Sequence, residues 1–361
     1  MVAGALANKH RHGGSQWVRM SWAESLMRLG FQVIFCERLH PGGDRLVFER
    51  AMRTIGIRGA LLDGHDVHGM EQSELEHHLE TSALLVNISG HLRDPDLLRR
   101  CRLRAFVDLD PGYTQIWHSE GHDVGLAGHH LHFTVGANVG THHSPLPDCG
   151  KRWIPVRQPV VLDRWPVGDG RFSGFTTVAS WRGAFGPVTW NGHTYGQKAH
   201  QFRAFASVPR DTGLAFAIAM DLHPADAADG KRLTEAGWTL LDPDRVATPT
   251  AFRRFVRQSG AEFSVAQGVY VETRSGWFSD RTVRYLASGR PALVQDTGFS
   301  RTIPVGEGLL AFKTPAEAAA LAADLVTDYA VHSTAARSLA EQMFTPERAL
   351  TPLLDATGVA P

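Results

Sequence analysis

The sequence has few cysteines, no net charge and no long apolar run, and each absence excludes a class of protein. Its three cysteines lie far apart in 361 residues without a C-x-x-C pair, which argues against a disulfide framework. Lys plus Arg equals Asp plus Glu, at 37 each, so no overall field attracts the chain to nucleic acid or anionic lipid. No apolar run reaches the roughly 18 residues that a membrane span needs. The N-terminal run MVAGALA is short and follows no basic residue, so we expect no signal peptide and a cytoplasmic protein.

Strand-like and helix-like segments alternate along the whole chain, which is long enough for two domains of about 150–200 residues. The first 36 residues read as strand, Gly-Gly loop, helix and strand, but no GxGxxG indicates a dinucleotide site. Proline and glycine gather in residues 155–174, which we interpret as an interdomain linker. Alternation on both sides of a linker predicts two parallel sheets covered by helices. Strands are predicted at 1–7, 31–36, 60–63, 83–89, 104–112, 131–136, 153–156, 174–180, 213–220, 237–242, 262–267, 292–296 and 308–312.

Residues 275–298, SGWFSDRTVRYLASGRPALVQDTG, hold the most informative local pattern. Ser279 or Asp280 suits a helix N-cap and Gly289 suits the helix end. The free amides and dipole at such a helix start attract an anion such as a diphosphate, to which Arg281 could add a charged fork. Gln295-Asp296 ends the following strand, at the sheet edge where open α/β sheets bind ligands. The alternative is an ordinary capped helix in an α/β domain.

This window resembles the donor-binding segment of GT-B glycosyltransferases, and residues 107–117, VDLDPGYTQIW, are similar to uncharacterised bacterial members of that group. The resemblance implies an α/β fold of GT-B type, with two doubly wound Rossmann-like domains facing across a cleft. Residues 1–160 would bind the acceptor, residues 161–345 would bind the nucleotide sugar, and residues 346–361 would cross back to the first domain. It also implies a hexosyltransferase-like enzyme that uses UDP or dTDP sugars and a small-molecule acceptor, without metal or other cofactor. The Ala-, Arg- and Gly-rich composition would suit a GC-rich bacterium and natural-product biosynthesis.

Glycosyl transfer needs a grip on the diphosphate, a polar cradle for the sugar and a base for the acceptor hydroxyl. By this resemblance the nucleoside base would lie near residues 242–246. The predicted donor-binding residues are Arg182, Lys198, Ser275, Gly276, Trp277, Phe278, Ser279, Asp280, Arg281, Gln295 and Asp296. For Arg182 and Lys198 the alternative is a solvated surface charge.

The loop after the first strand carries two histidines, and histidine titrates in the range that a base needs. We expect His12, and next His10, to be the base, although a loop histidine can simply face water. Asp108 and Asp110 at a strand end are the next catalytic candidates, or form only a chain reversal. The predicted acceptor-binding residues are Gly13, Gly14, Tyr113 and His118.

Three other interpretations remain open. A sugar-nucleotide epimerase can share this fold and donor site but needs no acceptor. A two-domain sugar-binding protein would be non-catalytic. A metal hydrolase could use the histidines, for which His118 with His122 and the cluster His129, His130, His132, His142 and His143 have ligand-like spacing. No HExxH or Cys/His pairing accompanies those histidines, so we predict no metal site.

Overall fold

The computed structural model of the chain describes residues 1–168, 170–183 and 185–361. It forms two compact units. Unit 1 consists of Met1–Gly140, Leu146–Val161 and Phe344–Pro361, and unit 2 consists of Thr141–Pro145 and Leu162–Met343. The main division therefore falls inside the predicted linker. Asp169 of that linker, and Ala184 in the turn that carries Arg182, lie outside the described residues.

Unit 1 is built on an eight-stranded sheet with the order β4-β3-β2-β1-β5-β6-β7-β8. Every pairing is parallel except that of β3 with β4. The order reverses direction between β1 and β5, which creates a crevice at the carboxyl ends of these two strands. The strands are β1 (Val2–Ala3), β2 (Ile34–Arg38), β3 (Arg58–Asp63), β4 (Asp66–His68), β5 (Leu85–Ile88), β6 (Arg104–Asp108), β7 (Leu131–Thr134) and β8 (Trp153–Pro155).

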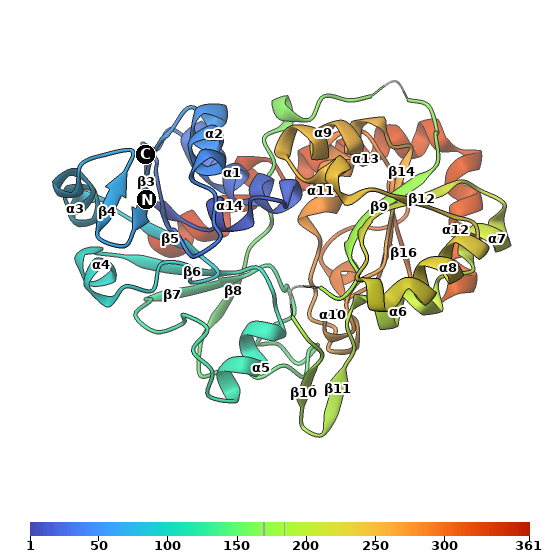
Figure 1. The fold of residues 1–361 in the computed structure, drawn as a ribbon, viewed down its shortest axis with the longest axis horizontal. Helices are drawn as coiled ribbons and strands as arrows, with labels where there is room; N and C mark the ends of the chain where they lie inside the picture. The colour runs from blue at the N-terminus through green and yellow to red at the C-terminus, as the bar shows by residue number, and fades with distance from the viewer. Residues whose placement is uncertain (169, 184) are drawn as a thin grey trace. The chain divides into compact units, whose positions relative to one another are not determined.

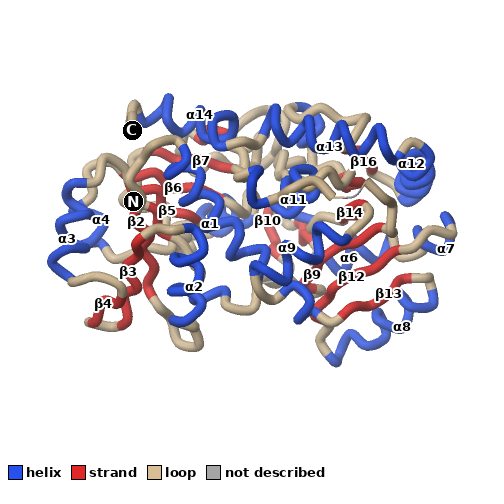
Figure 2. The backbone as a smooth tube through the Cα atoms, turned by 90° about the horizontal axis from the view of Figure 1, so that it is seen from above, coloured by secondary structure: helices blue, strands red, loops and turns tan. Residues whose placement is uncertain are grey.

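Helices cover both faces of this sheet (Figures 1 and 2). They are α1 (Gly13–Arg28), α2 (Arg45–Ile55), α3 (Gln72–Thr81), α4 (Pro95–Arg100), α5 (Tyr113–Ser119) and the C-terminal α14 (Pro346–Thr357). Leucines of α3 and α4 pack on strand residues such as Ala3 and Leu85, while α1 contacts α2 and α14. The C-terminal helix is thus part of unit 1 although unit 2 precedes it in the chain.

Unit 2 has a six-stranded, wholly parallel sheet with the order β13-β12-β9-β14-β15-β16. Here the order reverses between β9 and β14. A short antiparallel hairpin, β10 (Val188–Trp190) with β11 (His193–Tyr195), follows β9. The sheet strands are β9 (Phe175–Ser180), β12 (Phe216–Asp221), β13 (Trp238–Leu241), β14 (Ala261–Ser264), β15 (Ala292–Gln295) and β16 (Leu309–Phe312).

Aromatic side chains form the main core of unit 2, because the strands carry bulky residues toward one helical layer. Phe263 stacks on Phe312 with ring centroids 5.2 Å apart, and Phe175 stacks on Phe216 at 4.7 Å. The helices are α6 (Lys198–Ala204), α7 (Val208–Thr212), α8 (Ala227–Glu235), α9 (Pro249–Gln258), α10 (Gly268–Glu272), α11 (Asp280–Ala287), α12 (Pro315–Thr327) and α13 (Tyr329–Met343). Residues of α6, α7, α8 and α12 enter this core, whereas α11 packs against both α9 and α13. Among the described residues, no helix is long and apolar enough to cross a membrane.

The first predicted strand is shorter than expected. After β1, the chain turns into a short 3₁₀ segment at Ala7–Lys9, because the amides of Leu6, Ala7 and Asn8 donate to the buried Glu37 carboxylate at 2.8–3.0 Å. These contacts with Glu37 cannot be predicted from residues 1–7 alone, because Glu37 is distant from them in the sequence. The sequence analysis also missed β4, α5, α10 and the hairpin of β10 and β11, all of which are short.

Candidate functional site

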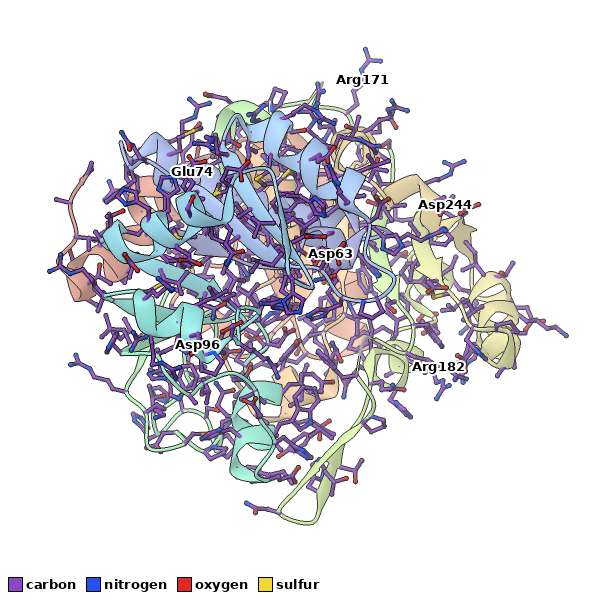
Figure 3. All side chains as sticks on the ribbon, turned by 60° about the vertical axis from the view of Figure 1, so that its left-hand side comes forward. Asp63, Glu74, Asp96, Arg171, Arg182 and Asp244 are labelled. Carbon is purple, nitrogen blue, oxygen red and sulfur yellow. The ribbon has the colours of Figure 1, made fainter. Side chains whose placement is uncertain are left out.

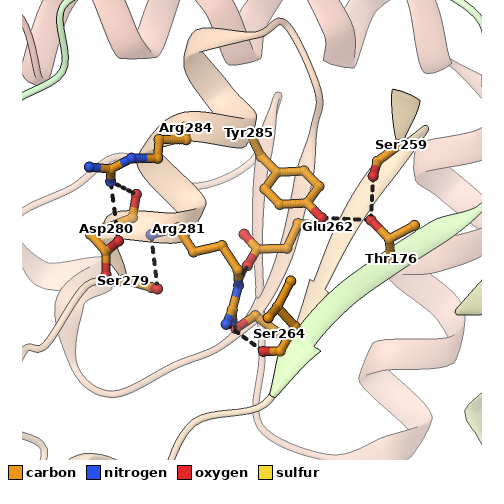
Figure 4. Close-up of polar contacts among 10 residues, drawn as sticks. Thr176, Ser259, Glu262, Ser264, Ser279, Asp280, Arg281, Arg284 and Tyr285 are labelled. Atoms are coloured by element: carbon orange, nitrogen blue, oxygen red, sulfur yellow. Dashed lines mark hydrogen bonds and ion pairs between the residues drawn. The ribbon is translucent and has the colours of Figure 1, made fainter. Parts of the chain in front are cut away.

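The crevice between β9 and β14 in unit 2 is closed by a buried ion pair. Arg281, in the first turn of α11, donates from Nε to Glu262 Oε1 at 2.5 Å. Its other nitrogens reach the Val178 carbonyl at 2.7 Å and Ser264 Oγ at 2.6 Å, as Figure 4 shows for the side-chain contacts. The guanidinium is 12% exposed and the Glu262 side chain is fully buried. Arg281 therefore ties helix α11 to the ends of both strands at the crevice.

Arg281 corrects one prediction. We expected its fork to be available to an anionic ligand, but each of its three nitrogens already has a protein partner. The proximity of the Glu262 carboxylate raises the pKa of Arg281 against the opposing effect of burial, so the guanidinium stays charged. A contact with a ligand beyond these bonds stays a prediction.

Lys198 is the cation that this crevice leaves without a salt bridge. It is the first residue of α6, as predicted, and is half-buried. Neither a hydrogen bond nor an ion pair of its ammonium occurs among the described residues. Burial first, and then the nearby Arg281 charge, lower the pKa of Lys198 to about 7, with Glu262 opposing them. A desolvated cation beside a second cation has a large electrostatic reason to bind an anion.

Arg182 lies in the turn after β9, as the sequence indicated, but it is exposed and forms a bidentate pair with Asp226 at 2.6 and 3.1 Å. Figure 3 labels it on the outside of the chain. Of the two alternatives that the sequence left for Arg182, the structure supports the surface charge. Lys198 is half-buried rather than a solvated surface charge, and its contact with the donor stays a prediction.

The loop before α11 also differs from expectation. The amides of Ser275 and Gly276 donate to Tyr270 and Thr297 carbonyls, and the Trp277 amide donates to Ser275 Oγ. The amides of Ser275, Gly276 and Trp277 are therefore engaged within the protein, and a contact of this segment with a diphosphate stays a prediction. Buried aromatic packing explains the turn, since Trp277 stacks on Tyr270 at 4.4 Å between ring centroids and Phe278 packs on Phe299 at 4.9 Å.

The start of α11 is capped as predicted, and anion binding at this helix start stays a prediction. Ser279 Oγ accepts from the Arg281 amide at 3.2 Å, which is the predicted N-cap contact. The carboxylate of Asp280 follows at once and pairs with the buried Arg284. A carboxylate at the first helical position satisfies the helix dipole and repels a second anion. Figure 4 shows Asp280 and Arg284 beside each other, away from the Arg281–Glu262 pair, and the Arg284 side chain is 1% exposed.

Gln295 and Asp296 lie at the carboxyl end of β15, as expected. Gln295 Oε1 accepts from the Ala266 amide at 3.1 Å and its Nε2 donates to Gln201 on α6 at 3.2 Å. Asp296 accepts from the Gly298 amide and the Ser300 hydroxyl at 2.8 and 2.9 Å. Both side chains are thus fixed in place at the sheet edge, and their role toward a sugar stays a prediction.

In unit 1, the loop that follows β1 holds the two histidines proposed as bases. His12 is exposed and immediately precedes α1, where its side chain makes no capping hydrogen bond. His10 is half-buried, and no hydrogen-bond partner of its Nδ1 is found in the described part of the chain. Gly13 and Gly14 form the first turn of α1 rather than part of the loop. Gln16 Nε2 donates to the Lys9 and His10 carbonyls at 3.0 and 3.1 Å, which links this loop to α1.

Asp108 corrects another prediction. Its carboxylate is fully buried at the end of β6 and accepts from the Asp110 amide, the Thr114 and Thr134 hydroxyls and the Gln115 amide nitrogen, at 2.7–3.0 Å. Burial raises the pKa of Asp108, although these hydrogen bonds oppose the shift. All its acceptor positions are used, so it organises the chain reversal that was the alternative reading and is neither a base nor an acceptor ligand. Asp110 is half-buried beside it.

The two aromatic acceptor candidates on α5 differ. Tyr113 is 1% exposed, and burial raises the pKa of its hydroxyl to about 12, so it belongs to the core rather than to a binding surface. That prediction is wrong because Tyr113 follows a turn that directs it inward, beside Trp117. His118, also on α5, is half-buried and remains a candidate.

Sequence reasoning missed four polar residues at the crevice of unit 1. Ser89 follows β5 in a left-handed conformation with φ of 53°, and its buried Oγ has no hydrogen-bond partner among the described residues. Burial, and then the Arg19 and Lys9 charges, lower the pKa of His91 to about 3, so His91 is neutral. Burial and Arg19 also lower the pKa of Lys9. Ser89 is the last residue of the strand predicted at 83–89, and the polar turn that Gly90 and His91 continue was the available signal.

The histidines do not assemble into a metal centre. No group of three or more His, Cys, Asp or Glu side chains is placed to hold an ion in residues 1–168, 170–183 and 185–361. His129 packs edge-on against Phe106, His130 contacts Arg104, and His142 lies against His143. These contacts give the cluster structural roles.

Comparison with profiles of protein families finds no match, and no curated protein matches the sequence. Solved structures do match. The Anabaena protein HepE (Alr3699), solved with UDP and glucose, has a TM-score of 0.60 and 11% identity over 99% of this chain and 98% of its own. Sucrose-phosphate synthase from Thermosynechococcus elongatus has a TM-score of 0.56 and 11% identity over 98% and 96% of the two chains.

AviGT4, a glycosyltransferase involved in avilamycin A biosynthesis, has a TM-score of 0.51 and 16% identity over 94% of this chain and 95% of its own. At such identities the likeness concerns the fold. The chain has the α/β architecture of GT-B glycosyltransferases, with a Rossmann-like sheet in each unit, and the predicted fold class is confirmed.

Proposed function

We propose that this protein transfers a sugar from a nucleoside diphosphate sugar, with UDP as the expected nucleotide, to a small-molecule acceptor without a metal ion. The observation that carries the proposal is Lys198, a half-buried ammonium without a salt bridge among the described residues, at the ligand-binding crevice of unit 2. A fold shared with HepE, which was solved with UDP-glucose, supports the choice of donor.

Lys198 would stabilise the diphosphate as the bond to the sugar breaks, because negative charge grows on the leaving group. A fixed cation in a partly desolvated site does this more effectively than one in water, since solvent screening is reduced. Gln295 and Asp296 at the neighbouring strand end would face the sugar hydroxyls. Arg281 would act indirectly, by holding the β9 and β14 ends around Lys198 and by keeping positive charge beside it.

Histidine in the loop after β1 would take the proton of the acceptor hydroxyl. His12 is the first candidate because it is exposed and precedes a helix that fixes its backbone, and His10 is the second. Asp110 and His118 remain acceptor-side candidates.

The test is thermal denaturation with UDP, dTDP, GDP and ADP, each with and without magnesium. A nucleotide that binds only the folded protein raises its stability by about 2.7 kcal/mol at a hundredfold excess over the dissociation constant. We expect UDP to stabilise the protein equally with and without magnesium, and Lys198→Met to weaken its binding about tenfold or more.

Lys231→Met is the matched control, because it removes an exposed lysine of α8 from the same unit. It should bind UDP like the wild type. If no nucleotide stabilises the protein, or if both lysine variants lose binding equally, the proposal fails. Incubation with the stabilising UDP sugar, followed by analysis of the sugar product, then separates transfer from epimerisation of the donor alone.

A further inference from the structure

Two loops leave neighbouring strands at the carboxyl edge of the unit 1 sheet, where the order of the strands reverses. β1 and β5 pair in parallel, with Ala3 opposite Asn87. The chain after β1 forms the 3₁₀ segment Ala7–Lys9, and the chain after β5 turns at residues 89–91. Loops at such a reversal point are where open α/β sheets bind ligands. This edge is therefore the place where we expect unit 1 to hold a ligand.

Lys9 has a fixed backbone and a side chain without a contacting partner. The carboxylate of Glu37 accepts hydrogen bonds from the amides of the three residues before Lys9, at 2.8–3.0 Å. Gln16 Nε2 donates to the Lys9 carbonyl at 3.0 Å. The Lys9 side chain is half-buried, and its ammonium makes no hydrogen bond or ion pair with any described residue. The fold thus holds a lysine at this edge and leaves its charge available.

Arg19 of α1 brings a second positive charge to the same edge. It lies against Gly4, directly after β1, where an added Cβ would be 3.0 Å from Arg19 Cγ and 3.7 Å from the Cβ of Ile88 at the end of β5. Arg19 is 7% exposed and donates to a serine of its own helix. Burial, and then the Arg19 charge, lower the pKa of Lys9, whereas Asp110 opposes them. At Lys9 the nearby cation therefore has a larger effect than the nearby carboxylate.

Ser89 is a residue that neither its backbone nor its protein neighbours explain. Its φ of 53° is left-handed, a conformation that glycine adopts more readily than any residue with a Cβ. Gly90 continues the turn with a φ of 61°, and a Cβ there would lie 3.1 Å from the Cα of Gly125, so the turn is closely packed. The buried Ser89 Oγ has no hydrogen-bond partner within the described parts of the chain. A buried hydroxyl in this state is destabilising unless a ligand or water completes its hydrogen bonds.

His91, at the end of the same turn, lies in a positive field. Burial is the first cause that lowers its pKa to about 3, and the Arg19 and Lys9 charges are the next. His40 and Arg93 act in the same direction. The imidazole of His91 is therefore neutral, and its ring makes no hydrogen bond with a described residue. A neutral imidazole can donate one N–H, and the surrounding charges favour an anion as the acceptor of that hydrogen bond.

We propose that this edge of unit 1 binds an anionic group, a carboxylate or a phosphate, of the acceptor. The Lys9 ammonium would pair with the anion, and the Ser89 hydroxyl and the His91 imidazole would donate hydrogen bonds to it. The inference rests on the proposed function, which assigns the acceptor to unit 1. Because Lys9 directly precedes His10 and its loop continues to His12, an acceptor held by its anionic group would lie at the loop that carries the predicted base.

The first test measures anion binding in a Lys198→Met background, which removes the cation proposed for unit 2. Thermal denaturation is followed with inorganic phosphate and with glycolate, each against sodium chloride at the same ionic strength. We expect at least one of these anions to stabilise the protein, and Lys9→Met to weaken its binding about tenfold. Lys151→Met is the matched control, because it removes the other lysine of unit 1, which is also half-buried. It should bind the anion as the background does.

Ser89→Gly is a second, independent variant. Glycine relaxes the left-handed backbone, so the variant should fold, and loss of the hydroxyl should weaken anion binding about tenfold. Asn191→Gly, at an exposed turn with a φ of 50°, is its control and should keep anion binding. Full anion binding in Lys9→Met or in Ser89→Gly would overturn the inference. Equal losses in the variants and their controls, or no stabilisation by either anion, would do the same.

The second test identifies the source of the anion by titrating UDP into the same variants with Lys198 restored. Lys9→Met and Ser89→Gly should bind UDP with wild-type affinity, because their site serves the acceptor. A loss of about tenfold in UDP affinity in Lys9→Met would show that the anion is the donor diphosphate, and would overturn the inference. If no nucleotide binds the wild-type protein while phosphate or glycolate still binds through Lys9, the proposed function fails and the anion site stands.

Discussion

The carboxyl edges of the two sheets are stabilised by different kinds of side chain. In unit 2 the edge is held by an ion pair: Arg281 binds Glu262 Oε1, Val178 and Ser264, while Glu262 Oε2 has no hydrogen-bond partner and Lys198 has no salt bridge among the described residues. In unit 1 the edge also has buried atoms without a partner in the described part of the chain, His10 Nδ1 and Ser89 Oγ, but neither residue belongs to an ion pair there. The unit 2 edge is thus organised around charged side chains, whereas the unit 1 edge has polar groups whose hydrogen bonds a ligand would complete.

The largest effect should come from unit 1. We expect His12→Ala to lower the turnover of a UDP sugar about 10²–10⁴-fold, the usual contribution of a positioned base, without changing UDP affinity. His65→Ala, which removes an exposed histidine between β3 and β4, is the control. Release of UDP is the readout. If His12→Ala turns over at the wild-type rate and His10→Ala is slower, the base is His10. If both variants turn over at the wild-type rate, unit 1 has no histidine base.

The next effect tests the closed edge of unit 2. Arg281→Met leaves Glu262 charged and buried without its partner, so we expect a loss of about 3–5 kcal/mol of unfolding free energy, measured by urea denaturation. Arg182→Met breaks the exposed pair with Asp226 and should leave the denaturation midpoint unchanged. Arg281→Met/Glu262→Leu should recover much of the loss. Equal midpoints for Arg281→Met and wild type would show that the pair does not hold the crevice.

Asp108→Asn tests whether Asp108 stabilises unit 1 or takes part in catalysis. The amide cannot accept all the hydrogen bonds that the buried carboxylate accepts, so we expect a loss of about 1–3 kcal/mol in stability. Turnover at a temperature where the variant is folded should stay within a few-fold of wild type. A rate loss like that of a base variant, without a stability loss, would restore Asp108 as a catalytic candidate.

The fold could be predicted because it depends on periodicity. Alternating apolar strands, Ser279 as an N-cap and the long helix that begins after Thr314 were all visible locally, and the structure contains them. Short elements such as β10 and α10 escaped because few residues carry their signal. The predicted length of β1 was wrong, because the carboxylate of Glu37, distant in the sequence, accepts hydrogen bonds from the amides that would extend the strand.

The site was less predictable, because a side chain's availability depends on partners far along the chain. Arg281 and Asp108 are the residue types that a phosphate site and a base need, yet Glu262 and Thr134 occupy them. Lys198 could be named from its place at a helix start, but its lowered pKa depends first on burial and then on Arg281, 83 positions away in the printed sequence.

The smallest expected effect concerns the pH dependence of Lys198. In the ligand-free protein its lowered pKa, about 7, makes the buried charge destabilise the fold fully below pH 7 and less as the pH rises toward the ordinary lysine value. A bound diphosphate favours the charged form, so binding above pH 7 should take up a proton. We therefore expect UDP affinity to fall several-fold from pH 7 to pH 9, below the limit of about tenfold per pH unit for one proton.

Titration calorimetry in two buffers of different ionisation enthalpy measures this proton uptake directly. Lys198→Met should bind UDP more weakly at every pH and show a flat profile between pH 7 and 9, while Lys231→Met should keep the slope of the wild type. If the pH dependence of UDP affinity persists in Lys198→Met, the titrating group belongs to another residue. Lys198 would then not be the charge that distinguishes the unit 2 edge from the unit 1 edge. If UDP binds tightly and its affinity does not change with pH in any variant, Lys198 is already charged in the free protein. Groups at this edge would then stabilise that charge equally in the free and the bound protein.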